Sequence, residues 1–228
     1  MILFILAAIA SAQSPAVKCP DVVTPQAFTC RALQASKDGE PEAAAQAFEQ
    51  AAEAQSEESE KARLWAAAGN MWIAANQAGK AAVALDKALS GTGLQAEQRG
   101  EALLDRARAA EAQNDLKTAR SKVTDAARTI SADPFLWYFS AALAIREGDA
   151  VTAKSAIGQA LTLEPNDPTV LFEAGHVYHF AGDLPAARSY WTRALAADPN
   201  GKSGQAAREA LAMLDKPAVV QNEAPATK

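Results

Sequence analysis

Three hydrophobic patterns follow one another along the chain. Residues 2–9 form an unbroken apolar run, residues 25–200 mix small and large apolar residues with polar ones, and residues 203–214 place their apolar residues on one face of a helix. Alanine dominates the middle pattern and makes up 57 of the 228 residues, a quarter of the chain. Because alanine is the best helix former and lets helices pack closely, the pattern predicts an all-α protein and argues against a β-sandwich or barrel.

Equivalent residues recur at one constant spacing in the middle region. The spacing from Gly148 to Gly182 is the same as that from Ala153 to Ala187, Ala160 to Ala194, Pro165 to Pro199, and Asp133-Pro134 to Asp167-Pro168. The clearest copy covers residues 168–200, and fainter copies cover residues 25–53, 62–93, 100–132 and 135–167. In each Asp-Pro pair an N-capping side chain precedes a proline at the first helical position, which predicts that helices begin at Pro134 and Pro168.

This pattern resembles the tetratricopeptide repeat (TPR), a helix–turn–helix unit of about 34 residues. The match rests on Gly175, Tyr178, Gly182-Asp183 and Trp191 in the clearest copy, and on Trp65, Gly69 and Trp72 in the copy at residues 62–93. The resemblance covers residues 25–200 and implies an all-α, right-handed α-α superhelix (solenoid) of about five helix pairs. It also implies that Gly175 lets the helices of a pair approach closely and that Gly182 forms the turn between them.

The region after the repeats is predicted from its own pattern. A solenoid leaves an apolar side on its last repeat, and residues 201–215 are expected to form the capping helix that covers it. Residues 216–228, with two prolines and few large apolar residues, are expected to be a disordered tail. Within the repeats, the steps from Ala51 to Ala88 and from Ala88 to Ala126 are longer than the constant spacing, which predicts additional residues in the links after the first, second and third repeats.

The first apolar run is predicted to belong to a signal peptide over residues 1–12. Ala10-Ser11-Ala12 supplies the small residues of a cleavage site. The run is short and no Lys or Arg precedes it, so an apolar N-terminus without a role in export is the alternative. It is too short to span a bilayer, which needs roughly 20 residues. Residues 13–24 are expected to form a linker.

Cys19 and Cys30 are the only cysteines of the chain. An even number of cysteines in an exported protein suggests a disulfide, because such bonds persist in oxidising compartments. A bond between these two would staple residues 19–24 to the first helix. Two free thiols are the alternative.

The charged and chemically reactive residues narrow the choice of function. The 22 basic and 27 acidic residues give a net charge of −5, which offers no basis for binding nucleic acid. The only histidines, His176 and His179, lie close together, and Glu173 and Asp183 are near them in the sequence. A cryptic metal-dependent enzyme around Glu173, His176 and Asp183 is therefore one hypothesis. Because carboxylates from other helices would also be needed, we expect no catalytic site, metal or cofactor.

The TPR resemblance also implies a binding surface. In this family the first helices line the concave face of the superhelix, and residues between the packing positions point into its groove. Those that suit the capture of a peptide or helix are Arg63, Asn70, Arg108, Phe135, Tyr138, Arg146, Phe172, His176, His179 and Phe180. In the weak copy at residues 100–132, Leu104 is also expected at a groove position. Packing on neighbouring helices is the alternative for the phenylalanines.

Together these features predict a non-catalytic scaffold or adaptor in the bacterial periplasm that binds a protein or peptide in its concave groove. The localisation follows from the predicted export. A module that contacts peptidoglycan or another glycan is the alternative of a different class, since aromatic side chains can stack on sugars.

Overall fold

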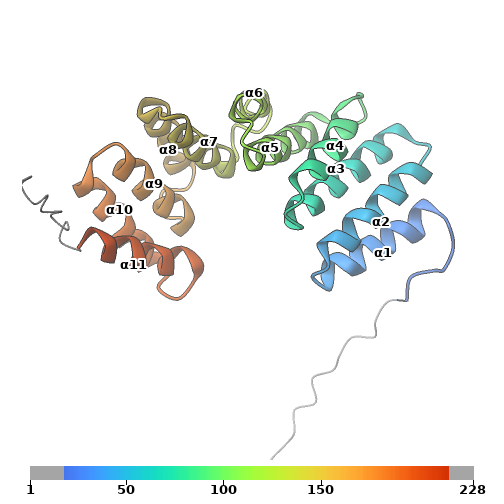
Figure 1. Cartoon of the computed structure of the whole chain (residues 1–228), viewed down its shortest axis with the longest axis horizontal. Coiled ribbons are helices and arrows are strands. Elements are labelled where there is room, and N and C mark those ends of the chain that lie inside the picture. Colours follow the sequence, from blue (N-terminus) through green and yellow to red (C-terminus); the bar gives the residue numbers. More distant parts are fainter. Residues whose placement is uncertain (1–17, 216–228) are drawn as a thin grey trace, which may run out of the picture.

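A computed structural model describes residues 18–215, which contain eleven α-helices and no strand. The helices are α1 (Pro25–Lys37), α2 (Pro41–Ala54), α3 (Glu58–Ala74), α4 (Ala78–Leu89), α5 (Ala96–Ala112), α6 (Leu116–Ala126), α7 (Pro134–Glu147), α8 (Ala150–Leu163), α9 (Pro168–Phe180), α10 (Leu184–Ala197) and α11 (Lys202–Leu214). Figure 1 shows them stacked in an arch, with α1–α4 and α9–α11 as its two limbs. The all-α solenoid predicted from the sequence is confirmed. The signal peptide expected at residues 1–12, the first part of the linker and the tail expected at residues 216–228 lie outside the described residues.

The first ten helices form five hairpins, and α11 packs on α10 and α9 at the C-terminal end. Each hairpin turns at a residue with positive φ, a conformation that ends helices and that few side chains adopt readily. The five turn residues are Gly39, Asn76, Asn114, Gly148 and Gly182. The expectation that Gly182 forms a turn is therefore confirmed, with φ at 78°.

The capping side chains begin the helices that the sequence predicts. Asp133 Oδ1 accepts a hydrogen bond from the backbone N–H of Phe135 at 2.8 Å, and α7 begins at Pro134. Asp167 Oδ1 accepts from the N–H groups of Thr169 and Val170, and α9 begins at Pro168. A cap of this kind stabilises a helix by about 1 kcal/mol, because it satisfies a backbone donor that has no partner inside the helix.

The long step from Ala51 to Ala88 has a different origin from the one that the sequence predicts. Only residues 55–57 link α2 to α3, whereas α3 itself is 17 residues long and begins at Glu58. The extra residues after the first repeat therefore extend a helix, and the prediction of a longer link was wrong there. The links from α4 to α5, residues 90–95, and from α6 to α7, residues 127–133, are longer than that from α2 to α3. However, α5 has 17 residues like α3, so the second step also lengthens a helix.

Small residues allow the helices to stack closely. The five equivalent alanines, Ala51, Ala88, Ala126, Ala160 and Ala194, are completely buried. A Cβ atom added to Gly175 would lie 2.2 Å from two atoms of the Trp191 indole, so α9 and α10 approach as closely as the sequence predicts. The indole is held in place because its Nε1 donates to the carbonyl oxygen of Phe172 at 3.1 Å.

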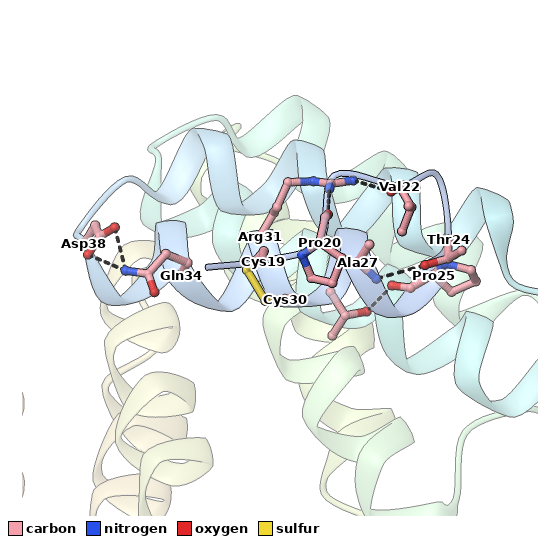
Figure 2. The surroundings of a disulfide bond; sticks show 11 residues. Cys19, Pro20, Val22, Thr24, Pro25, Ala27, Cys30, Arg31, Gln34 and Asp38 are labelled. Carbon is pink, nitrogen blue, oxygen red and sulfur yellow. Dashed lines mark hydrogen bonds between the residues drawn. A yellow bond between two sulfur atoms is a disulfide. The ribbon is translucent and has the colours of Figure 1, made fainter. Parts of the chain in front are cut away.

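The N-terminal end of the solenoid is held by a disulfide between Cys19 and Cys30 (Figure 2). The Arg31 guanidinium reinforces this connection by donating to the carbonyl oxygens of Pro20 and Val22, at 2.8 and 3.3 Å. The segment that precedes α1 consequently lies alongside that helix. We call residues 19–24 the N-terminal strap.

Candidate functional site

The odd-numbered helices share one face of the solenoid, because α3 packs on α5, α7 on α9, and α9 on α11. We call this surface the first-helix face. It is where the sequence places the expected binding residues, and it contains both cavities and aromatic side chains.

Two cavities that share Leu33 open on the first-helix face of the N-terminal half. One, of about 720 Å³, lies between α1 and the start of α3 and is lined by Thr29, Cys30, Leu33 and Leu64, among others. The second, of about 470 Å³, extends from Leu33 over α3 to α5. Both volumes fall within the range of about 300–1,000 Å³ that is usual for ligand sites. We call the two cavities together the N-terminal groove.

The hollow over α3 lies above two small outward side chains of that helix. Ala66 and Ala67 form part of its floor, together with Met71, and Leu94 lies on the side of α5. Leu33 projects at the boundary of the two cavities and is 58% exposed. An apolar floor with an exposed leucine beside it offers surface that a partner could remove from water.

The expected polar residues of α3 and α5 are engaged with carboxylates of the same chain. Asn70 Nδ2 donates to Asp105 Oδ2 at 2.8 Å, and Arg108 donates to Asp105 Oδ1 at 2.8 Å. Arg63 forms an ion pair with Glu60, one helical turn earlier. Arg63 and Asn70 line the second cavity of the groove, so their hydrogen-bonding groups lie at its edge.

Carboxylates also gather beside the groove on α5. Burial raises the pKa of Glu101 above its usual value, and the nearby negative charges of Glu97, Asp105 and Asp133 raise it further. Within residues 18–215, Asp105 is paired with Arg108, whereas Glu97 and Glu101 form no ion pair. Negative charge is therefore in excess at this edge.

A line of contacts leads from α5 to α7. The Arg108 guanidinium lies over the Phe135 ring, 5.4 Å from its centroid, and Phe135 meets Tyr138 edge-on at 4.9 Å. Tyr138 is half-buried, and desolvation, followed by the negative charges of Glu173 and two aspartates, raises the pKa of its hydroxyl to about 12. Tyr138 is therefore a neutral hydrogen-bonding group at physiological pH.

The expected residues of α9 gather around Trp191 of α10. The His176 ring lies 4.5 Å from Phe172 and 5.4 Å from Trp191, and the His179 ring lies 5.6 Å from Trp191. Burial lowers the pKa of His176, and the neighbouring His179 lowers it further. Phe180, at the end of α9, is 40% exposed. We call Phe172, His176 and His179 with Trp191 the C-terminal aromatic cluster.

Two expected positions differ from the others. Arg146 ties α7 to the end of α5 and to the turn that follows it: it forms an ion pair with Glu111 of α5 and donates to the Asn114 side chain in the turn at 2.8 Å. Leu104 is only 3% exposed and belongs to the core between α5 and α6, so the prediction that it faces the groove was wrong.

The groups considered for catalysis have structural contacts instead of a shared site. Asp183 accepts a hydrogen bond from the backbone N–H of Ala186 and thereby caps α10. Among the described residues, no group of three or more His, Cys, Asp or Glu side chains is placed to hold a metal ion. The helices between residues 18 and 215 include none that is long and apolar enough to cross a membrane.

Sequence reasoning missed the main residues of the N-terminal groove: Leu33, Leu64, Ala66, Ala67 and Glu101. Leu33 and Glu101 belong to the weak first and third copies of the repeat. One indication was available, because Leu33 is a large apolar residue next to Gln34 on a helix whose buried residues, Ala27 and Ala32, are small. The meeting of α1, α3 and α5 at one hollow could not be deduced from any single copy.

Comparison with solved structures identifies the fold. PilW, a widely conserved type IV pilus biogenesis factor, matches with a TM-score of 0.67 at 16% identity, over 79% of this chain and 81% of its own. Pseudomonas aeruginosa PilF matches with a TM-score of 0.66 at 16% identity, over 83% of each chain. YrrB, a TPR protein with an unusual peptide-binding site, matches with a TM-score of 0.59 at 18% identity, over 80% of this chain and 91% of its own. No family model and no curated protein matches the sequence. The chain therefore has the TPR fold that its repeat spacing predicts.

Proposed function

We propose that this chain of TPR fold is a non-catalytic scaffold or adaptor of the bacterial periplasm that binds a protein or peptide segment on its first-helix face. The observation that carries the proposal is the N-terminal groove, beside which side chains from Arg108 to Tyr138 continue along the same face. A long surface with an apolar floor and a polar edge suits an elongated ligand. YrrB, which shares the fold, is described as having a peptide-binding site, and this supports the proposal.

Export to the periplasm is supported by three features. The sequence begins with an apolar run and a small-residue site of the kind that signal peptidases cleave. Cys19 and Cys30 form a disulfide, and such bonds persist in oxidising compartments. PilW, which shares the fold, is named for pilus biogenesis, a process of the cell envelope.

The absence of a catalytic role is supported by the surroundings of the three residues considered for chemistry. His176 lies between Phe172 and Trp191, and Asp183 caps a helix. Glu173 is partly buried, and its raised pKa is explained by desolvation. The contacts of each residue therefore account for its position without a role in a reaction.

Site-specific photocrosslinking in cells tests the proposal. A photoreactive amino acid replaces Tyr138 on the first-helix face or, as a control, Val151, which is 80% exposed on α8. We expect a distinct protein adduct in the periplasmic fraction from position 138 and none from position 151. We also expect that a Tyr138→Ala/His179→Ala variant captures less of that partner. The same adducts from both positions, or equal capture by the double variant, would contradict the proposal.

A further inference from the structure

We infer that the N-terminal groove binds a partner segment that carries an apolar side chain with Lys or Arg a few residues away. This inference deepens the proposed function and rests on it, because it names the chemistry of the segment that the first-helix face selects. Two observations, one apolar and one electrostatic, meet at the same place.

The apolar observation is the exposed floor of the groove. Leu33, more than half exposed, contributes to both cavities, while Ala66 and Ala67 provide a flat surface of small side chains over α3. A leucine, methionine or phenylalanine from a partner would cover this floor and remove apolar surface from water. The two cavities adjoin at Leu33, so one elongated segment can occupy both.

The electrostatic observation is the excess of carboxylates on the α5 side of the same floor. Glu101 lines the second cavity, and Glu97 lies one helical turn before it. Asp105 is paired with Arg108, and Asp133 caps α7. Among residues 18–215, Glu97 and Glu101 are therefore the carboxylates at this edge that have neither an ion pair nor a helix cap to make. The raised pKa of Glu101 reports this crowding, in addition to burial. A cationic side chain placed beside the apolar contact would relieve it.

Charge complementarity favours this occupant over a second copy of the chain. With a net charge of −5, two copies would repel each other on average, and a copy docked at α5 would have to place a basic patch there. A short segment of a partner needs only one or two basic residues in the right place. Interfaces use such complementary charges to select partners.

Binding of designed peptides to the purified mature protein tests the inference by fluorescence anisotropy. The probe is a fluorescein-labelled peptide in which leucine and lysine recur between serines. One analogue of equal length has glutamate for every lysine, and the other has serine for every leucine. We expect the leucine–lysine peptide to bind most tightly, and its affinity to fall as salt is added, because salt screens exposed charges.

Two pairs of protein variants locate the interaction. We expect Glu97→Gln/Glu101→Gln to weaken binding of the leucine–lysine peptide by about fivefold, as the loss of two exposed charge contacts implies. Glu53→Gln/Glu209→Gln removes two exposed carboxylates from α2 and α11, makes the same change in net charge and should leave the affinity unchanged. Ala67→Phe, which fills the hollow, should weaken the binding of both peptides that contain leucine, the leucine–lysine peptide and its glutamate analogue. Circular dichroism verifies that every variant is folded.

Three results would overturn the inference: equal binding of the lysine and glutamate peptides, equal effects of the two carboxylate pairs, or no effect of Ala67→Phe. Its failure can be distinguished from failure of the proposed function. If the partner crosslinked at position 138 is still captured by Glu97→Gln/Glu101→Gln at full strength, the proposed function stands and the basic-segment inference fails. If no partner crosslinks at position 138, the proposed function fails on its own test.

Discussion

The N-terminal and C-terminal halves of the solenoid make different surfaces from the same helix hairpins. In α3, the outward positions on the first-helix face include Ala66 and Ala67, and a hollow opens above them. In α7 and α9, aromatic residues such as Tyr138 and His176 stand on this face. The size of the residues between the packing positions therefore decides whether a stack of repeats presents a groove or a filled surface.

The tryptophans show the same contrast from the other side. Trp65 and Trp72 of α3 are buried in the core of the N-terminal half, 6% and 2% exposed, and are covered by the ammonium groups of Lys87 and Lys80. Trp191 is equally buried, but its ring supports the histidines of α9. The tryptophans of the N-terminal half thus lie away from its groove, whereas in the C-terminal half the Trp191 indole is part of the aromatic cluster.

The largest expected loss of stability comes from adding a methyl group where two helices of a hairpin are in close contact, which can be done in both halves. Gly175→Ala places a Cβ 2.2 Å from the rigid Trp191 ring, and we expect it to lower the free energy of unfolding by about 3 kcal/mol. Gly69→Ala meets the side chain of Leu85 at 2.4 Å, and the smaller, more flexible leucine should limit the loss to about 1–2 kcal/mol. Urea denaturation monitored by circular dichroism measures both.

Gly158→Ala is the matched control for these substitutions. It also adds a methyl group to a helix, but nothing lies within 4 Å of the new Cβ, so it should stabilise the chain by up to about 1 kcal/mol. Equal losses at Gly69 and Gly175 would show that the two halves pack with the same rigidity and would contradict the contrast.

The second-largest loss of stability is expected from removing the disulfide, and it should affect only the N-terminal end of the solenoid. Replacing both cysteines in a Cys19→Ser/Cys30→Ser variant removes a cross-link between cysteines with a sequence separation of 11, which should cost about 2–3 kcal/mol. The loss should be local to the first hairpin, because each repeat contacts only its neighbours. Hydrogen exchange should therefore become faster in α1 and α2 and remain unchanged in α9–α11. Uniform acceleration along the chain would show instead that the solenoid unfolds as one cooperative unit.

The third prediction compares the change in stability at two hairpin turns, one formed by glycine and the other by asparagine. Gly182→Ala should cost about 1 kcal/mol because φ is 78° there, although the surrounding space is empty. In the N-terminal half the same conformation is held by Asn76 at a φ of 57°, so Asn76→Gly should be neutral or slightly stabilising. Thermal melts of both variants test this. A Gly182→Ala variant as stable as the original chain would contradict a conformational requirement at this turn.

The smallest expected change in stability concerns Glu173, a partly buried carboxylate of the C-terminal half. Burial raises the pKa of Glu173 in the folded state, so folding favours its protonated form. Its contribution to stability is complete below the unfolded value and is lost as the pH rises through the folded pKa. Glu173→Gln should consequently be more stable than the original chain at pH 7.5, by less than about 1 kcal/mol, and no more stable at pH 4. Both chains contain His176, so its titration cancels when their free energies of unfolding are subtracted at each pH.

Much of the fold could be predicted because its determinants are local or recur at a fixed spacing. Asp133 and Asp167 cap helices two residues ahead, and Gly175 meets Trp191 within one hairpin. α3 begins at Glu58, four residues before the copy of the repeat at residues 62–93, with Glu57 as its cap and no proline in its first turn.

The binding surface was harder to predict because it depends on the offset between repeats. Arg146 occupies a plausible groove position, but its partner Glu111 lies on another hairpin and becomes visible only when the hairpins are stacked. Leu104 was assigned to the groove in a copy of the repeat without large rings, where the helical register is weakly marked. The hollow at Leu33, Ala67 and Glu101 combines three helices from three different copies.

The N-terminal strap has a consequence for the order in which the chain matures. Because the sequence holds only two cysteines, oxidation within one chain has a single product, and no wrong pairing has to be reshuffled. Both partners precede the end of α1, so the bond requires none of the later hairpins. The first helix can therefore acquire its covalent anchor while most of the solenoid is still unfolded, which gives stacking a fixed end from which to proceed.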